Sequence, residues 1–204
     1  MIVYLNGNSF TTKYNNSNTV VFNNGDNVVD EVRGYLVFQN NDWVLIGVAQ
    51  FQSNYKKRKK EKIALILESP HKDEFSANYV PIRPANGVTG KKIEKKIGQK
   101  ANSWNLTKTT AYEINIINAI QFQCSCWNQL GVFDRKLRNS VFRVLFNPNM
   151  GNLKQHFIMR LQNYKPNIIV NACTYPMKNT IVANAIKASN NGASIYNEPH
   201  PSVW

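Results

Sequence analysis

The sequence predicts an α/β fold with three layers, α/β/α, around a central and mostly parallel sheet of about four strands. From residue 59 onward, short β-branched apolar runs alternate with longer amphipathic segments, which is the pattern of strands joined by crossover helices. The chain of 204 residues, 43% of them hydrophobic, is long enough to bury one large core. The first 58 residues differ, because short strands alternate there with polar turns. We therefore expect a β-rich N-terminal extension over residues 1–58, followed by a domain over residues 59–204.

The expected strands of the central sheet are four short apolar runs bounded by polar residues, at residues 63–68, 113–120, 167–172 and 193–197. Segments with apolar residues at helical spacing are found among them, at residues 90–98, 133–146 and 153–166. The last segment places Leu153, Phe157 and Leu161 on one face and stops at Pro166.

The N-terminal extension contains the runs "NTVVFNNGDN" and "GYLVFQNNDWVLIGVAQF". Asn40, Asn41 and Asp42 separate two β-rich halves of the second run, as a hairpin loop would. The stretch "YKKRKKEK" follows at residues 55–62 with six basic side chains. We interpret it as a solvated linker or turn, and a phosphate-binding patch is the alternative.

The charge of the chain indicates an anionic partner. Its 25 basic and 12 acidic residues give a net charge of +13 and a sequence pI near 9.7, which is typical of proteins that bind nucleic acid. A basic surface without such a partner is the alternative. No apolar stretch approaches the roughly 20 residues that cross a bilayer, and the start "MIVYLNGNSF" lacks the plan of a secretory signal. We expect a monomer in the cytoplasm, with no membrane partner.

The three cysteines, Cys124, Cys126 and Cys173, are too few for a disulfide scaffold. No second pair accompanies Cys124 and Cys126 to complete a tetrahedral zinc or iron–sulfur site. Reduced and partly buried thiols are the expected state. We therefore predict neither a cofactor nor a metal ion.

Polar residues follow several of the expected strands. The run "IALILESPHKDE" changes abruptly from apolar residues to Glu68, Ser69, Pro70 and His71. Asn118 lies near the end of another strand, and His200 follows the last one. In open α/β sheets, ligands bind beyond the carboxyl ends of the strands. The side chains of Glu68, Asn118 and His200 are therefore predicted to meet at one rim.

These segments resemble the uracil-DNA glycosylase superfamily. Its first motif is of the Gly-Gln-Asp-Pro-Tyr-His or Gly-Glu-Ala-Pro-Gly type, and its last motif contains His-Pro-Ser. Here Glu-Ser-Pro at 68–70, Ile-Ile-Asn-Ala-Ile at 116–120 and His-Pro-Ser at 200–202 occur in the same order. Glu74 lies where the Glu-Ala-Pro branch has a second acid, "PIRPANGVTGKKIEKKI" resembles its Pro/Gly-rich loop and helix, and "PNIIVNA" resembles its penultimate strand. The resemblance covers roughly residues 60–204.

The chain also departs from the family pattern. Ser69 stands where the most familiar branch has its catalytic aspartate, and no cysteine precedes Cys124 to form the iron–sulfur cluster of the Glu-Ala-Pro branch. His71 stands at the position that shapes the pocket beside pyrimidine C5. The identity of the excised base is therefore left open.

The resemblance implies a role for each residue type. His200 would donate a hydrogen bond to O2 of the departing base, and Glu68 would orient the attacking water. Asn118, or Asn115 in the alternative register, would read the base edge. The remaining implied contacts are Ser69 and His71 at the base, Ser69 and Ser202 at flanking phosphates, Trp204 as a wedge in the base stack, and Lys91 and Lys92 on the DNA backbone. A capping histidine, a surface ion pair of Glu68, a packed Trp204 and a solvated lysine face are the structural alternatives.

The predicted function is a monofunctional DNA glycosylase that acts on double- or single-stranded DNA and leaves an abasic site. The base is uracil in a repair role, or a modified pyrimidine such as a decorated cytosine of viral DNA in antiviral defence. A non-catalytic DNA-binding or sensing protein on the same fold is one alternative. A metal-dependent nuclease using Glu68, Asp73 and Glu74 is the other, although Asp73 and Glu74 also fit the N-terminus of a helix.

Overall fold

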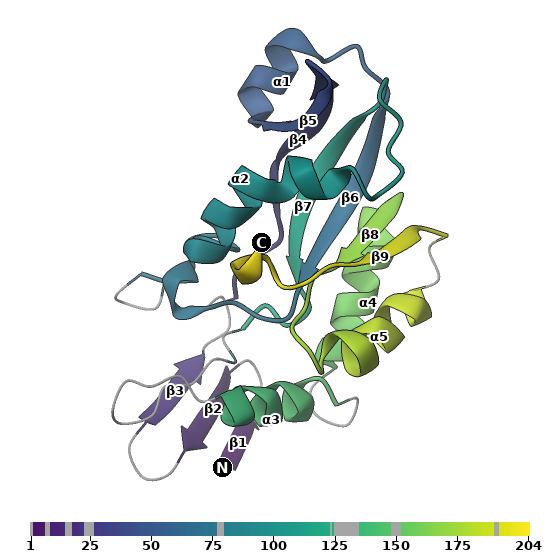
Figure 1. Cartoon of the computed structure of the whole chain (residues 1–204). Coiled ribbons are helices and arrows are strands. Elements are labelled where there is room, and N and C mark those ends of the chain that lie inside the picture. Colours follow the sequence, from purple (N-terminus) through teal and green to yellow (C-terminus); the bar gives the residue numbers. More distant parts are fainter. Residues whose placement is uncertain are drawn as a thin grey trace.

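The computed structural model describes residues 2–6, 9–14, 18–22, 27–76, 80–122, 124, 135–147, 152–189 and 192–204 (Figure 1). Cys126 of the sequence analysis lies outside these residues. The fold is α/β, as predicted. Its larger sheet has six strands in the order β5-β4-β7-β6-β8-β9. Strands β6 (Lys60–Leu67), β7 (Ala111–Asn118), β8 (Ile168–Asn171) and β9 (Ser194–Asn197) are parallel.

The prediction of about four strands was wrong by two. Strand β4 (Glu31–Gln39) pairs with β7 and with β5 (Asp42–Ile46), antiparallel in both cases. Residues that were assigned to the N-terminal extension thus continue the central sheet. The physical reason lies in β7, which is almost completely buried along its length. Because β6 covers only one edge of β7, its other edge needs a partner for the backbone hydrogen bonds.

A separate antiparallel sheet is formed by β1 (Ile2–Asn6), β2 (Ser9–Tyr14) and β3 (Asn18–Phe22). The predicted hairpin loop is also present, since Gln39 and Asp42 are paired across the β4–β5 turn. Asn40 and Asn41 have φ values of 50° and 63°. Asparagine tolerates this left-handed conformation better than most residues, which explains why this sequence turns here.

Helices cover both faces of the six-stranded sheet (Figure 1). Helix α2 (Val88–Ala101) packs on one face through Ile93 and Ile97. Helices α3 (Arg135–Leu145), α4 (Leu153–Tyr164) and α5 (Ala183–Ser189) contribute to the core on the other face. Alternate residues of β6 point to the two cores, Ile63 and Leu65 to the first and Ala64 and Ile66 to the second. The three layers predicted from the sequence are therefore present.

Helix α1 (Val48–Asn54) precedes β6, and its Phe51 stacks on Tyr35 of β4 with ring centroids 3.9 Å apart. The segments expected to be helical at 90–98, 133–146 and 153–166 correspond to α2, α3 and α4. In the part of the chain that is described, no helix combines the length and the apolar character that a membrane span requires.

Helix α2 lies unusually close to the edge of the sheet at Gly98. A Cβ atom added there would lie 2.0 Å from the carbonyl oxygen of Trp43 in β5. The absence of a side chain at this position therefore sets the distance between the helix and the strand.

We expect Gly98→Ala to destabilise the protein by about 1–3 kcal/mol, because the helix must move away from the backbone of β5 to make room. Gly47→Ala is the matched control, since nothing lies within 4 Å of its added Cβ. The measurement is urea unfolding of both variants. Equal midpoints for the two variants would contradict this account of the packing.

Candidate functional site

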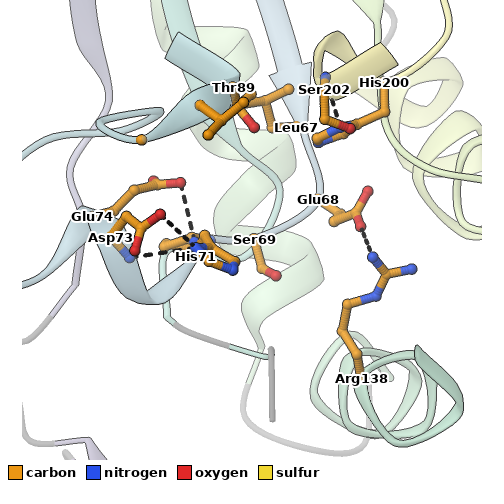
Figure 2. Close-up of a pocket in the computed structure, with 13 residues that line it drawn as sticks. Leu67, Glu68, Ser69, His71, Asp73, Glu74, Thr89, Arg138, His200 and Ser202 are labelled. Atoms are coloured by element: carbon orange, nitrogen blue, oxygen red, sulfur yellow. Dashed lines mark hydrogen bonds and ion pairs between the residues drawn. The ribbon is translucent and has the colours of Figure 1, made fainter. Parts of the chain in front are cut away.

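A cavity of about 340 Å³ lies beyond the carboxyl end of β6 (Figure 2). It is lined by residues 67–71, 73–74 and 87–89 together with Arg138, His200 and Ser202. This volume falls within the roughly 300–1,000 Å³ typical of small-molecule sites. The residues come from distant parts of the chain, because β6, β7, β8 and β9 are parallel and their carboxyl ends share one edge of the sheet.

Glu68 is the first residue after β6 and its exposed fraction is only 5%. Its Oε1 accepts hydrogen bonds from Arg138 Nη1 and from Thr174 Oγ1, both at 2.8 Å. Its Oε2 accepts one from the Thr174 backbone N–H at 2.6 Å. A carboxylate has about four acceptor positions, and these three donors leave one that none of the described residues fills. Glu68 is thus held rigidly, and one acceptor position remains for a water molecule or a ligand.

Sequence reasoning missed Arg138 and Thr174. Arg138 lies on α3 in the segment "FDRKLRNSVFRVLF". This segment has several basic residues, and no neighbouring motif singles out one of them. Thr174 follows β8 in a segment that resembled only a strand end. Only the folded chain brings these two residues together, so a sequence pattern does not reveal them. Arg138 Nη2 donates a hydrogen bond to Thr174 Oγ1 at 2.9 Å. The surface ion pair considered for Glu68 is in fact a largely buried one.

His200 lies next to Ser202, on the opposite side of the cavity from Asp73 and Glu74 (Figure 2). Its Nδ1 accepts a hydrogen bond from the Ser202 backbone N–H at 3.2 Å and lies 2.8 Å from Ser202 Oγ. Burial lowers the pKa of His200 below its usual value, and nearby Arg138 and His71 act in the same direction, against Glu68. A neutral imidazole that accepts at Nδ1 carries its proton on Nε2. His200 therefore has Nε2–H as its donor.

The segment after His200 is fixed to α2. Lys92 Nζ donates to the carbonyl oxygens of Ser202 and Trp204, at 3.0 and 3.3 Å. Trp204 packs against the core on this face, and its Nε1 donates to the Pro199 carbonyl oxygen at 2.8 Å. Of the two lysines assigned to the DNA backbone, Lys91 is exposed and Lys92 has this internal role. The geometry of Trp204 corresponds to the packed alternative.

Asn118 ends β7 and is 1% exposed. Its Nδ2 donates to Glu74 Oε2 at 3.3 Å, and its Oδ1 has no hydrogen-bond partner among the described residues. Asn118 does not itself line the cavity but contacts Glu74, which does. The alternative, Asn115, pairs with Ala64 in the middle of the sheet, about 10 Å from the rim at the rise of a β-strand. Asn118 is therefore the asparagine near the site.

Glu74 is a second buried carboxyl group in the cavity wall, with an exposed fraction of 4%. Burial raises the pKa of Glu74 to about 7, against hydrogen bonds from the backbone of His71 and Ala85 and from Asn118. A carboxyl group with such a pKa in a cleft is a frequent property of functional sites. Sequence reasoning noted Glu74 by its resemblance to the second acid of the family, as a possible metal ligand and as an acid at a helix N-terminus, but it gave no sign that this carboxyl group is buried.

His71 and Ser69 both line the cavity. The His71 backbone N–H donates to Glu74 Oε1 at 3.1 Å, and its Nδ1 lies 3.3 Å from Asp73 Oδ2. Asp73 is exposed, and its backbone oxygen accepts from Asn86 Nδ2 at 2.9 Å. These contacts tie the loop after β6 to the Pro/Gly-rich loop before α2.

The described residues contain no group of three or more His, Cys, Asp and Glu side chains that could hold a metal ion. Glu68, Asp73 and Glu74, the acids considered for a metal-dependent nuclease, lie in one cavity but do not form such a group. Glu68 is paired with Arg138, and Glu74 accepts from Asn118.

The basic stretch at 55–62 lies away from the cavity. It includes the first residues of β6, whereas Glu68 follows the last residue of that strand, about 25 Å away at the rise of a β-strand. Lys60 and Arg58 lie over the rings of Phe51 and Tyr55, at 5.2 and 5.0 Å from the centroids. The stretch is thus partly a packed turn between α1 and β6.

Comparisons of the chain with models of known protein families, with curated proteins and with solved structures gave no match. The chemistry of the cavity is therefore the basis for a functional proposal.

The raised pKa of Glu74 predicts a pH-dependent stability. Folded Glu74 binds its proton up to about pH 7, and unfolded Glu74 only up to its usual value near 4.5. The stability from this proton is complete below pH 4.5 and is lost as the pH rises through 7. Between pH 4.5 and 8, the free energy of unfolding of Glu74→Gln should therefore rise by about 3 kcal/mol relative to the native protein.

Urea unfolding at several pH values measures this difference. Thr89→Val, which changes a neutral residue of the same cavity, should give a stability curve parallel to that of the native protein. A parallel curve for Glu74→Gln would show that the carboxyl group is already ionised at acidic pH in the folded state.

Proposed function

We propose that this protein is a monofunctional DNA glycosylase of the uracil-DNA glycosylase type, which extrudes a pyrimidine nucleotide and hydrolyses its N-glycosidic bond. The observation that carries the proposal is the arrangement of Glu68 and His200 on one cavity, with a single acceptor position left on the acid and a fixed Nε2–H donor on the imidazole. Base excision needs these two functions, since negative charge develops on the base and positive charge on the sugar.

His200 acts on the departing base. Its Nε2–H donates to the pyrimidine O2, where negative charge accumulates as the glycosidic bond breaks. This hydrogen bond strengthens in the transition state, so it lowers the barrier more than it stabilises the bound substrate. A neutral imidazole serves this purpose over the physiological pH range because burial lowers the pKa of His200.

Glu68 acts on the sugar side. Its remaining acceptor position binds a water molecule and directs it at the anomeric carbon, and its negative charge offsets that of the oxocarbenium-like sugar. Arg138 and Thr174 hold the carboxylate in one orientation. A carboxylate held in one orientation accelerates the reaction more than a mobile one, because the attacking water molecule must be aligned with the anomeric carbon.

The net charge of +13 supports DNA as the partner, because it attracts a polyanion and accelerates association. Double- and single-stranded DNA both remain substrates in this proposal, with the protein as a monomer. A cytoplasmic location is also part of it, supported by the reduced and buried thiol of Cys173. The base is uracil or a modified pyrimidine, and removal of a decorated cytosine from viral DNA would serve antiviral defence.

Glu68→Gln and His200→Ala should each lower the rate of base release by at least about tenfold, since positioned acid–base groups contribute roughly 10²–10⁴. The measurement is base release by mass spectrometry from DNAs that contain uracil, hydroxymethylcytosine or glucosylated hydroxymethylcytosine. Glu61→Gln is the matched control, because Glu61 lies on the same strand far from the cavity. Full activity of either site variant would remove that residue from the mechanism.

Val203 is better placed than Trp204 to fill the gap that an extruded nucleotide leaves in the stack. It is 70% exposed and follows Ser202 directly, whereas Trp204 is packed. Inserted apolar side chains stabilise distorted duplexes in this way.

Val203→Ala should therefore lower base release from duplex DNA several-fold and leave release from single-stranded DNA nearly unchanged. The ratio of the two rates is the measurement. Val48→Ala, an exposed valine on α1, is the control. An equal loss on both substrates would assign Val203 a structural role.

A non-catalytic DNA-binding protein is the second candidate. It is favoured by one observation, namely that three of the four acceptor positions of Glu68 are occupied by Arg138 and Thr174. Such a protein would shift DNA in a gel with strong salt dependence. It would leave no abasic sites that hot alkali cleaves, which separates the two candidates.

A further inference from the structure

We propose that Glu74, held in place by Asn118, recognises an exocyclic amino group, so that the cavity takes a cytosine-type base in preference to uracil. This inference rests on the proposed function and names the substrate class of the same site. The inference follows from the hydrogen-bonding groups that line the cavity around Glu74.

Glu74 offers an acceptor to the cavity. Its Oε1 accepts the His71 backbone N–H at 3.1 Å, and its Oε2 accepts Asn118 Nδ2 at 3.3 Å. The backbone of Ala85 provides a further hydrogen bond. Of the roughly four acceptor positions of a carboxylate, one is left. Because Glu74 lines the cavity, a ligand can reach it.

Asn118 holds Glu74 and does not line the cavity itself. Its partner Glu74 is a carboxylate, which accepts, so the group that Asn118 turns toward it must be the donating Nδ2. The amide oxygen Oδ1 is then left without a partner among the described residues, in a side chain that is 1% exposed. A buried acceptor without a donor destabilises a protein by about 1–3 kcal/mol. Asn118 therefore contributes to the site by holding Glu74 Oε2 and not by contacting the base.

The two common pyrimidines differ in the group that meets such a wall. Cytosine and its 5-substituted derivatives carry an amino group at C4, which donates, whereas uracil carries a carbonyl oxygen, which accepts. Carboxylates are the usual protein partners of the cytosine amino group. Uracil O4 would face the carboxylate of Glu74, and the contact of one acceptor with another excludes a ligand effectively.

The arrangement of the cavity fits this orientation of the base. Figure 2 shows Glu74, Asp73 and His71 on one side of the cavity and Glu68 with Arg138 on the other. In a pyrimidine, O2 and the C4 substituent lie on either side of N3. A base that directs O2 to His200 and its sugar to Glu68 can therefore direct its C4 substituent to Glu74.

The charges around Glu74 give the preference a pH dependence. His71 and Asp73 lie on its own loop, Arg33 of β4 favours its ionised form, and Glu68, Arg138 and His200 face it across the cavity. Protonation near pH 7 turns the carboxylate into a donor, which suits uracil O4. The preference for the amino base should thus decrease as the pH falls from 8 to 6.

The experiment compares binding of free cytosine, 5-hydroxymethylcytosine and uracil by the full chain at pH 8, together with release of each base from DNA. We expect the amino bases to bind at least about tenfold more tightly than uracil, as one good hydrogen-bonded pair provides. In Glu74→Gln, whose amide can donate, the ratio should fall below about threefold or reverse. Glu61→Gln, on the far end of β6, should keep the native ratio.

Three results would overturn the inference: uracil binding as tight as that of cytosine, an unchanged ratio in Glu74→Gln, or no binding of any of the bases. If Glu74→Gln does not fold, the native protein provides the test, since its ratio should fall roughly fivefold to tenfold between pH 8 and pH 6. Selective binding without base release from any DNA would contradict the glycosylase proposal alone. Release of uracil in preference to cytosine-type bases would contradict the amino-group inference alone.

Discussion

The parallel pairing of β6 with β7 on one side and β8 on the other is the constraint on which the site depends. In this register Leu67 lies beside Asn118, and Ile66 lies beside Asn171. The chain therefore leaves all these strands at the same edge, and Glu68, Asn118 and Thr174 emerge within reach of one another. A shift of one residue would turn the apolar side chains of β6 to the opposite faces. Burial on both faces consequently fixes the position of Glu68 as firmly as its own hydrogen bonds do.

Two carboxyl groups on one cavity have different electrostatic surroundings, which suits them to different roles. Glu68 has a guanidinium group at 2.8 Å. Glu74 accepts from the neutral groups His71 N–H and Asn118 Nδ2, and burial raises its pKa to about 7. Environments that differ in this way separate an acid paired with a cation from an acid whose protonation can follow its ligand. In the proposed function, this contrast lets Glu68 act on the sugar end of the nucleotide through its charge and Glu74 act on the base through its hydrogen-bond acceptor.

The sequence predicted those parts of the fold that depend on local pattern. The apolar run that ends at Glu68 identified β6, and the spacing of Leu153, Phe157 and Leu161 identified α4. The joining of β4 to β7 was missed, because the pairing of distant strands leaves no local signal. For the same reason Glu68 was found as a residue at a strand end, but its partners Arg138 and Thr174 were not. The internal role of Lys92 was also hidden, since an exposed lysine and a lysine bonded to backbone carbonyls look alike in a sequence.

The position of His200 depends on helix α2 rather than on the sheet alone. Glu198 accepts from Trp104 Nε1 and pairs with Lys100, both at 3.1 Å, and Lys92 holds the carbonyl oxygens that follow Ser202. The backbone N–H of Ser202 is thereby held against His200 Nδ1, and this donor favours the tautomer whose proton is on Nε2. If the segment were free to move, the two tautomers would compete, and Nε2 would carry the proton only part of the time. The packing of α2 on the core therefore holds the His-Pro-Ser turn in the conformation that favours one tautomer of His200.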